Sequence, residues 1–380
     1  MSRSLQFMVN PRHGTPGLVT LHAAGFRRAR AEITSWPGYA ATPLPSLPGL
    51  AAQAGVAALH LKDEAGRFGL GSFKALGGAY AVLGVVQAEL ARRGVAPNAS
   101  AAALEAGHHP ESHGVTVCCA TDGNHGRSVA WGAQRFGASC VIFVHEAVSP
   151  GRIEAIAAYG AEIRVVPGTY DDAVHAAAEA ASREGWCVVS DTSYAGYTEV
   201  PREVMQGYRL MVDEALDQVP APPSHVFIQA GVGGVAASVA VHVRARLPQE
   251  TVLVVVEPDR AACLLESARA GAPVRLGGAL DTVMACLACG EPSLLAWQEL
   301  DRSAAAFLAI GDAPAVDAMR LLAAEGIVAG ESGAAGLAGF LAAAADAACR
   351  AALGLGPDSR VLLFNTEGAT DPALYASLTA

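Results

Sequence analysis

Lys74 is the residue of this chain whose surroundings most favour covalent chemistry. It lies in the run Lys62–Gly78, among glycines, an aromatic side chain and aliphatic side chains. Burial in such surroundings lowers the pKa of a lysine amine and makes it a nucleophile that can form a Schiff base with an aldehyde. A single lysine in a helix-like run is usually a solvated surface residue, so the other motifs of the chain must decide between these two interpretations.

Three glycine-containing loops each follow a strand-like apolar run. The loops are Ala120–Arg127, Gln229–Gly234 and Phe364–Asp371, and the runs before them are Val115–Cys119, His225–Ile228 and Arg360–Leu363. Helical patterns follow the first two loops, where glycines let backbone N–H groups converge on a phosphate at a helix N-terminus. One such loop is weak evidence, because tight packing explains most of them. Four motifs in this order favour a site for pyridoxal phosphate (PLP).

With these motifs the chain resembles the fold-type-II PLP enzymes and, within them, the diaminopropionate ammonia-lyases. The resemblance runs from about Tyr39 to the C-terminus. The matching motifs are Phe68-Gly-Leu, Phe73-Lys74, Ala120-Thr-Asp-Gly-Asn-His-Gly, Gln206-Gly-Tyr208, Gln229-Ala-Gly-Val-Gly233, Ala288-Cys-Gly-Glu-Pro292, Gly330-Glu-Ser-Gly333 and Asn365-Thr-Glu-Gly368. Asp122 is the residue that best distinguishes the diaminopropionate ammonia-lyases from related enzymes, because threonine and serine dehydratases and cysteine synthases carry Ser or a small residue at this position.

The chain departs from this family at two motifs. It has Gly71-Ser-Phe-Lys74, the sequence typical of dehydratases, where the family commonly has Asn-Ala-Phe-Lys. It has Asp191-Thr-Ser-Tyr-Ala-Gly-Tyr197 where the family commonly reads Asp-Thr-Ala-Trp-Glu-Gly-Tyr. These departures concern substrate scope more than reaction class.

The resemblance implies a role for each motif in binding the cofactor. Lys74 would carry PLP covalently, Asn124 would hydrogen-bond the ring 3-hydroxyl, and Thr366 would face the pyridine nitrogen. A neutral hydroxyl at that nitrogen gives little help in holding a proton on it, which favours expulsion of a β-leaving group over transamination. The cofactor-binding residues so implied are Lys74, Phe73, Asn124, Gly231, Val232, Gly233, Gly234 and Thr366.

The reaction implied is α,β-elimination from 2,3-diaminopropionate, giving pyruvate and two molecules of ammonia. Lys74 would take the Cα proton on the face of the L-enantiomer and Asp122 on the opposite, D-facing side. Asp122 and Asp191 would attract the second ammonium group of the substrate and exchange protons with it. The implied catalytic residues are Lys74, Asp122 and Asp191, and the implied substrate-binding residues are Asp122, Tyr170, Asp191 and Thr192. Asp191 follows a strand end, so a turn cap is the other interpretation of it.

Three other functions are alternatives to this one. A threonine or serine dehydratase-type ammonia-lyase shares the Gly-Ser-Phe-Lys spelling but would not require Asp122. A non-catalytic sensor of PLP or an amino acid is disfavoured by the intact Lys74. A dinucleotide-binding oxidoreductase is disfavoured because neither glycine loop is followed by an acidic ribose partner in a convincing βαβ unit.

The alternation of strand-like and helix-like runs predicts an α/β protein with two lobes, each a mostly parallel sheet flanked by helices, as the resemblance also implies. The 380 residues are 52% apolar and 16% charged, which allows a large core. We predict a large PLP-binding lobe from residues 1–89 and 208–380, and a small lobe from residues 90–207. The small lobe carries the loop Ala120–Arg127, called the asparagine loop because it contains Asn124. In the small lobe, 139–144, 162–166 and 186–189 are predicted strands. Ser149-Pro150 should start a helix that Gly160 ends, 171–184 should form the next, ended by Gly185, and 97–114 should be a surface insertion.

The charge and cysteine content indicate which binding partners and which cellular compartment to expect. A net charge of −10 without charge blocks predicts neither nucleic-acid nor membrane binding. The sequence has no apolar run of about 18 residues and no recognisable leader, so we expect a cytoplasmic protein. We expect its partner to be a small amino-acid substrate. We also expect a homodimer, because this is the commonest oligomeric state of soluble enzymes. Cys286 and Cys289 form a C-x-x-C without a second pair, so no metal site is predicted. Whether Cys263 and Cys289 approach each other is left open.

Overall fold

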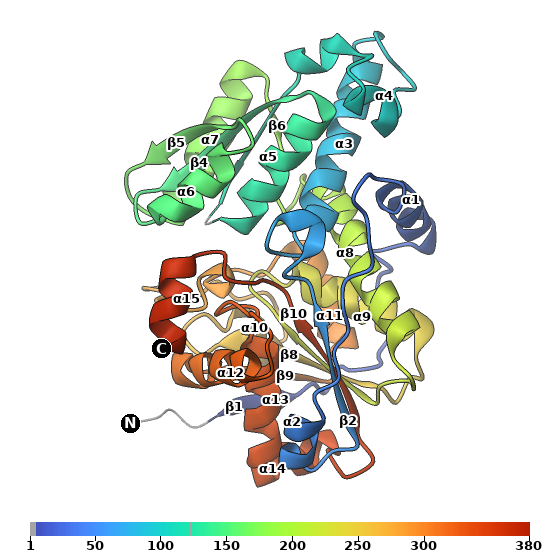
Figure 1. Ribbon diagram of the computed structural model, residues 1–380, viewed down its shortest axis with the longest axis vertical. Coiled ribbons are helices and arrows are strands. Elements are labelled where there is room, and N and C mark those ends of the chain that lie inside the picture. Colours follow the sequence, from blue (N-terminus) through green and yellow to red (C-terminus); the bar gives the residue numbers. More distant parts are fainter. Residues whose placement is uncertain (1–4, 122) are drawn as a thin grey trace.

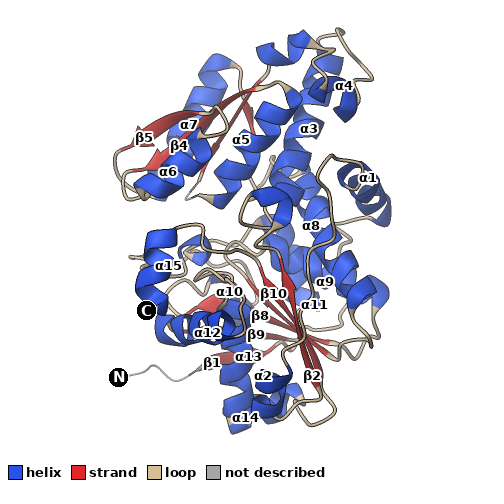
Figure 2. Ribbon diagram, viewed as in Figure 1, coloured by secondary structure: helices blue, strands red, loops and turns tan. Residues whose placement is uncertain are grey.

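The computed structural model describes residues 5–121 and 123–380, so Asp122 lies outside the described residues. Two sheets stand one above the other in Figure 1, with long helices running between them. The upper sheet has four strands and the lower sheet has six. The predicted fold class, two lobes with mostly parallel sheets flanked by helices, is confirmed (Figure 2).

The six-stranded sheet is parallel except at one edge. Its strands, in spatial order, are β1 (Gln6–Val9), β9 (Ala306–Ile310), β8 (Val252–Pro258), β7 (His225–Gln229), β10 (Arg360–Asn365) and β2 (Ala58–Asp63). Only the pair β1 and β9 is antiparallel. The central strands are continuous apolar runs because helices cover both faces of a parallel sheet. Their carboxyl ends meet at one edge, where a binding site of an open α/β sheet is expected.

The four-stranded sheet is parallel throughout. Its spatial order is β5 (Glu162–Val166), β4 (Ser139–His145), β3 (Thr116–Ala120) and β6 (Cys187–Val188). These strands confirm those predicted in the middle of the chain. The lobe boundaries at residues 90 and 207 stay a prediction.

Fifteen helices are assigned in the described residues. They are α1 (Ala23–Ile33), α2 (Pro48–Ala54), α3 (Ala75–Arg92), α4 (Ala101–Glu105), α5 (Asn124–Phe136), α6 (Pro150–Ala157), α7 (Tyr170–Glu184), α8 (Glu199–Gln218), α9 (Gly234–Arg246), α10 (Cys263–Ala270), α11 (Leu294–Ser303), α12 (Asp312–Ala324), α13 (Ala335–Ala345), α14 (Ala347–Leu353) and α15 (Pro372–Thr379). Three short 3₁₀ turns lie at Arg67–Gly69, Pro110–Gly114 and Ala285–Leu287.

Helices α3 and α8 run between the two sheets and pack against each other (Figure 1). They approach closely at a glycine: a Cβ on Gly207 would lie 1.9 Å from the carbonyl oxygen of Leu76. Because α3 starts directly after Lys74, this contact fixes the segment that carries the lysine relative to α8.

Helix α6 starts at Pro150, as predicted, but its predicted end needs correction. Ser149 is the N-cap residue of α6, but its hydroxyl donates to Asp371 at 2.9 Å and does not cap the helix. Helix α6 ends at Ala157, and Gly160 lies in the turn after it with a φ of +80°. Gly185 ends α7 in the left-handed conformation, as predicted. The predicted insertion 97–114 contains α4 and a 3₁₀ turn.

The described residues contain no clear membrane-spanning helix, metal cluster or disulfide bond. No single helix there is long and apolar enough to cross a membrane; the pair α13 and α14 qualifies together by length and composition but is bent by 103°. No group of three His, Cys, Asp or Glu side chains in residues 5–121 and 123–380 is placed to hold a metal ion. No disulfide bond joins cysteines in the described residues.

Candidate functional site

Lys74 stands between the two lobes at the N-terminus of α3. The segment before it is joined to the third predicted loop, because the N–H of Phe73 donates to the carbonyl oxygen of Thr366 at 3.1 Å. Ser72 and Glu367 form an isolated β-bridge beside this contact. Gly71 has a φ of +77°, a conformation that favours glycine, so the turn into Lys74 depends on that residue type. The lysine motif and the loop after β10 therefore form one unit.

The Lys74 ammonium forms an ion pair with the carboxylate of Asp191, which follows β6 in the small lobe. The two side chains are 19% and 17% exposed. Burial opposes the charge on Lys74, but the Asp191 carboxylate outweighs it, and the pKa of Lys74 is raised. Burial likewise disfavours the Asp191 charge, yet the Lys74 ammonium, with His125 when it is protonated, holds the pKa of Asp191 below its usual range. The sequence predicted a lowered pKa because it considered burial alone. That prediction is wrong in this structure, because Asp191 raises the pKa of Lys74.

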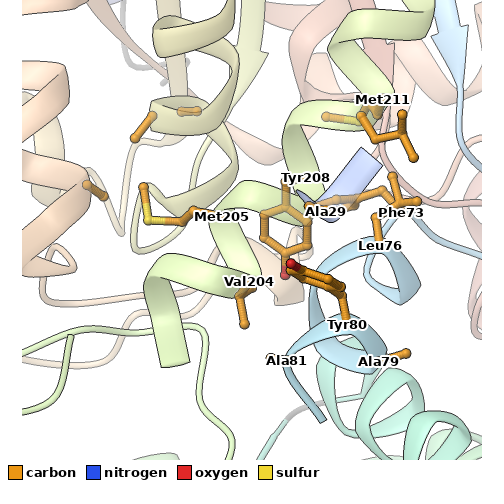
Figure 3. Close-up of a cluster of buried hydrophobic side chains, with 14 of the residues drawn as sticks. Ala29, Phe73, Leu76, Ala79, Tyr80, Ala81, Val204, Met205, Tyr208 and Met211 are labelled. Atoms are coloured by element: carbon orange, nitrogen blue, oxygen red, sulfur yellow. The ribbon is translucent and has the colours of Figure 1, made fainter. Parts of the chain in front are cut away.

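Two aromatic rings form the wall beside the lysine. The rings of Phe73 and Tyr208 lie 4.6 Å apart between centroids, and the Lys74 nitrogen lies 5.4 and 5.7 Å from them. Figure 3 shows both rings within the buried cluster where α3 and α8 meet. The buried hydroxyl of Tyr208 has no hydrogen-bond partner in the described part of the chain. An apolar wall with an unused donor is the kind of surface on which a flat polar ligand binds.

The asparagine loop contacts the loop after β10 across the two lobes. The Asn124 amide donates to the carboxylate of Glu367, and the thiol of Cys286 donates to the same oxygen at 3.4 Å. Ser332 adds a backbone N–H to the other oxygen at 3.1 Å. Glu367 is thus surrounded by donors, one of which is the amide predicted to bind the cofactor ring.

The loop Gly231–Gly234 has the geometry of an anion cradle. It leads into α9, and Gly233 has a φ of +96°. The backbone N–H groups of Gly231, Val232 and Gly233 donate to no protein acceptor among the described residues. A Cβ on Gly231 would lie 2.8 Å from the sulfur of Cys289, so close packing demands glycine. Three unused donors at a helix N-terminus fit a phosphate.

Gln229 prepares Thr366 for an acceptor. The Gln229 amide donates to the Thr366 hydroxyl oxygen at 2.8 Å and to two backbone carbonyl oxygens at 3.0 Å. Because the hydroxyl oxygen already accepts this bond, its own hydrogen is available to a further acceptor. An unprotonated pyridine nitrogen is such an acceptor. The residues present therefore fit PLP at its phosphate, its ring nitrogen and its aldehyde.

Ser293 connects the phosphate loop to the segment that carries Asp191. Its N–H donates to the carbonyl oxygen of Val232 at 2.9 Å, and its hydroxyl lies 2.6 Å from that of Ser193. The carbonyl oxygen of Asp191 would lie 3.6 Å from a Cβ on Gly234. The anion cradle and the Lys74–Asp191 pair are thus held side by side.

A second ion pair joins the two lobes. Arg152 of α6 donates to Glu331 at 2.8 Å. Burial, followed by the charge of Glu367, raises the pKa of Glu331 to about 7. Sequence reasoning did not single out Arg152, Glu331 or Glu367, although two of them lie in motifs that were quoted for the resemblance.

The structure brings together most of the predicted site residues. Lys74, Phe73, Asn124, Asp191, Thr366 and Gly231–Gly234 are joined by the contacts above. Thr192 follows Asp191, and its N–H donates to the Ser190 hydroxyl at 3.1 Å. Tyr170 is the first residue of α7 and is 37% exposed, so its contact with substrate stays a prediction. Asp122 lies outside the described residues, and its role also stays a prediction.

Comparisons with known proteins agree with this geometry. Residues 35–367 match the family model described as pyridoxal-phosphate dependent enzyme. The chain is 40% identical over 351 residues to a diaminopropionate ammonia-lyase of Escherichia coli strain K12, which covers 89% of this chain and 87% of that protein. An L-threonine dehydratase of Salmonella typhimurium is 31% identical over 178 residues, covering 46% and 32% of the two chains.

A solved structure is similar over nearly the full length. It is the crystal structure of the Escherichia coli diaminopropionate ammonia-lyase in complex with an aminoacrylate-PLP azomethine reaction intermediate. The TM-score is 0.89 at 36% sequence identity, with 99% of this chain and 97% of that chain covered. The likeness therefore includes the relative placement of the two sheets.

Proposed function

This chain belongs to the pyridoxal-phosphate dependent enzymes, among the diaminopropionate ammonia-lyases, and on that premise we propose that it converts 2,3-diaminopropionate and water into pyruvate and two molecules of ammonia. Its cofactor is PLP. When bound, PLP withdraws electrons from the substrate and acidifies its Cα–H bond. The residues of this chain then have to bind the substrate, take up that proton and favour departure of the β-amino group.

The observation that carries the proposal is the ion pair of Lys74 with Asp191 at the meeting point of the four motifs. Asp191 already binds an alkylammonium group, that of Lys74. The β-ammonium of diaminopropionate is the same chemical group. Serine and threonine have a neutral hydroxyl at this position, so they make no use of the carboxylate. A buried carboxylate here therefore supports a diamino substrate over a hydroxy amino acid.

Lys74 and Asp122 have complementary tasks in the proposal. Lys74 takes the Cα proton on the face of L-diaminopropionate, and Asp122 takes it on the opposite face, from the D-enantiomer. Tyr170, Thr192 and Asp191 contact the substrate, with Asp191 receiving its second ammonium group. The backbone of Gly231–Gly234 binds phosphate, Asn124 the ring oxygen, Thr366 the ring nitrogen, and Phe73 packs beside the lysine.

The threonine or serine dehydratase reading is the weaker alternative. The dehydratase relative covers less than half of this chain, whereas the ammonia-lyase relative covers 89%. Product stoichiometry separates the two activities directly. Diaminopropionate yields two ammonia molecules for each pyruvate, whereas serine yields one.

We further propose that the protein is a cytoplasmic homodimer that binds neither nucleic acid nor membranes. The support is its net charge of −10 and the common occurrence of two-fold symmetric enzymes.

Asp122→Asn tests the assignment of the two bases. The substitution keeps the size of the side chain and removes its ability to accept a proton. Turnover of D-diaminopropionate should fall by about 10²–10⁴-fold, the range for a lost general base, and turnover of the L-enantiomer should fall less because Lys74 remains. Rates are measured as pyruvate and ammonia released from each enantiomer, after both wild-type rates are known.

Asp317→Asn on the exposed surface of α12 is the matched control, since Asp317 is an exposed carboxylate that pairs with Arg320 of the same helix. It should leave both rates unchanged. Equal losses on both enantiomers in Asp122→Asn would assign Asp122 to binding or to protonation of the leaving amine. No loss on either would remove it from the site.

A further inference from the structure

His125 lies at the second residue of α5, with its ring buried against the Lys74–Asp191 pair. Its Nε2 atom is 2.8 Å from the carbonyl oxygen of Val189. A carbonyl oxygen accepts hydrogen bonds, so Nε2 carries the hydrogen in the neutral ring and Nδ1 carries a lone pair. That Nδ1 atom is buried and has no hydrogen-bond partner among the described residues. The ring is therefore anchored at one nitrogen and unsatisfied at the other.

The unsatisfied nitrogen faces Asp191. His125 Nδ1 lies 3.8 Å from Asp191 Oδ2, the same oxygen that pairs with Lys74. The distance is too long for a hydrogen bond, but a shift of less than about 1 Å would make one. Lys74 and His125 are thus two nitrogen partners arranged around a single carboxylate oxygen.

Among residues 5–121 and 123–380, the other titratable groups around this oxygen are neutral. They are Tyr208 of α8, Cys119 of β3 and Tyr197 in the loop after Asp191, and burial raises the pKa of each above its ordinary value. Among the described residues, the charge on Asp191 is therefore balanced by Lys74 now and by His125 if Lys74 is withdrawn. A buried carboxylate that loses its cation must gain another or become protonated.

We propose that His125 is a positioning residue that takes a proton on Nδ1 when the Lys74 nitrogen is committed to the cofactor, and so keeps Asp191 ionised and in place for the substrate's ammonium group. The proton comes from solvent, and only an N–H bond forms. This inference rests on the proposed function of the same site. It adds a residue that the motif analysis quoted within Ala120–Gly126 but to which it gave no role.

The electrostatics have the required sign. Burial lowers the pKa of His125, Asp191 raises it and the Lys74 ammonium lowers it. Loss of the Lys74 charge removes a cause that lowers the pKa and leaves the one that raises it. The pKa of His125 should therefore rise, and the ring should be protonated over a wider pH range.

The cofactor-free protein provides the decisive test. In Lys74→Ala the ammonium group is absent without any cofactor. The pKa of His125 is measured by NMR on protein with ¹⁵N-labelled histidine, with His125→Gln used to assign the signal. We expect it to be at least about one unit higher in Lys74→Ala than in wild type, the size of a nearby charge effect. If Lys74→Ala does not fold, Lys74→Gln replaces it.

Two further measurements sharpen the result. Adding Asp191→Asn to Lys74→Ala should abolish the rise, because the attracting carboxylate is gone. In wild type, PLP should raise the His125 pKa, and pyridoxine 5′-phosphate should not, because it has no aldehyde and leaves Lys74 charged.

His242 is the matched control, since it is also buried and lies 3.0 Å from a carboxylate, that of Asp213. Its pKa should not change in Lys74→Ala. An unchanged His125 pKa, protonation of Asp191 instead, or an equal shift of His242 would overturn the inference. The Lys74→Ala comparison needs no cofactor, so a failure of PLP to bind would count against the proposed function and leave this comparison intact.

Discussion

Lys62 and Lys74 are both buried lysines beside a carboxylate, only twelve positions apart, yet their surroundings differ in completeness. Lys62 of β2 donates to the carbonyl oxygen of Thr42 at 2.7 Å, to Gln218 at 2.8 Å and to Glu214 at 2.7 Å. These are three acceptors for the three hydrogens of an ammonium group. Lys74 has one carboxylate acceptor and two aromatic rings around it.

The same contrast holds for the charges around each lysine. Near Lys62, Arg67 pairs with both Glu64 and Glu214, so two cations face two anions. Near Lys74, the Nδ1 atom of His125 and the hydroxyl of Tyr208 are buried without partners in the described residues. The Lys62 network is closed and can only hold structure. The Lys74 network is open, because two of its buried polar atoms are not hydrogen-bonded.

Lys74→Ala should have the largest effect, which is a loss of catalytic turnover. It removes both the covalent attachment point for PLP and the base for the L-enantiomer, so turnover should fall by more than about 10⁴-fold. Borohydride reduction of the wild-type holoenzyme followed by peptide mapping should place the pyridoxyl group on Lys74. Lys62 is the internal control, because its three hydrogen bonds keep its nitrogen from the cofactor. Label on Lys62 would reverse the roles of the two lysines.

Lys62→Met should have the next largest effect, on stability. The substitution leaves Glu64 and Glu214 with one cation between them in a buried site. Breaking such a pair costs about 3–5 kcal/mol, so the free energy of unfolding in urea should fall by that amount. Adding Glu214→Gln restores charge balance, and the double variant should lose less than the sum of the single variants. Additive losses would show that the network is not coupled.

The sequence could predict the meeting of the motifs but not the state of the network around them. Lys74, Asn124, Gly233 and Thr366 follow strands or precede helices, and the carboxyl ends of parallel strands share one edge of a sheet. Their convergence therefore follows from secondary structure. The family resemblance supplied the reaction class.

What the sequence could not predict are contacts between side chains far apart in the chain. The raised pKa of Lys74 requires Asp191, 117 positions away. Ser149 precedes its helix as predicted, but its hydroxyl binds Asp371, 222 positions away, in place of the helix. His125 was passed over because only the hydrogen bond to Val189 reveals which of its nitrogens is unsatisfied. Such facts depend on tertiary packing, which local patterns do not encode.

Two tyrosines, one in the closed Lys62 network and one in the open Lys74 network, give the test with the smallest expected effect. The Tyr39 hydroxyl donates to Glu214 at 2.9 Å in the closed network, and the Tyr208 hydroxyl has no partner among the described residues. Tyr39→Phe leaves a buried carboxylate one donor short and should cost about 1.5–3 kcal/mol, as for hydrogen bonds to charged groups. Tyr208→Phe removes a buried hydroxyl that lacks a hydrogen bond. It should leave the stability of the cofactor-free protein unchanged or raise it by up to about 1 kcal/mol. Urea unfolding of both variants measures the difference. Equal losses would mean that Tyr208 is as fully bonded as Tyr39, and the Lys74 network would then not be open.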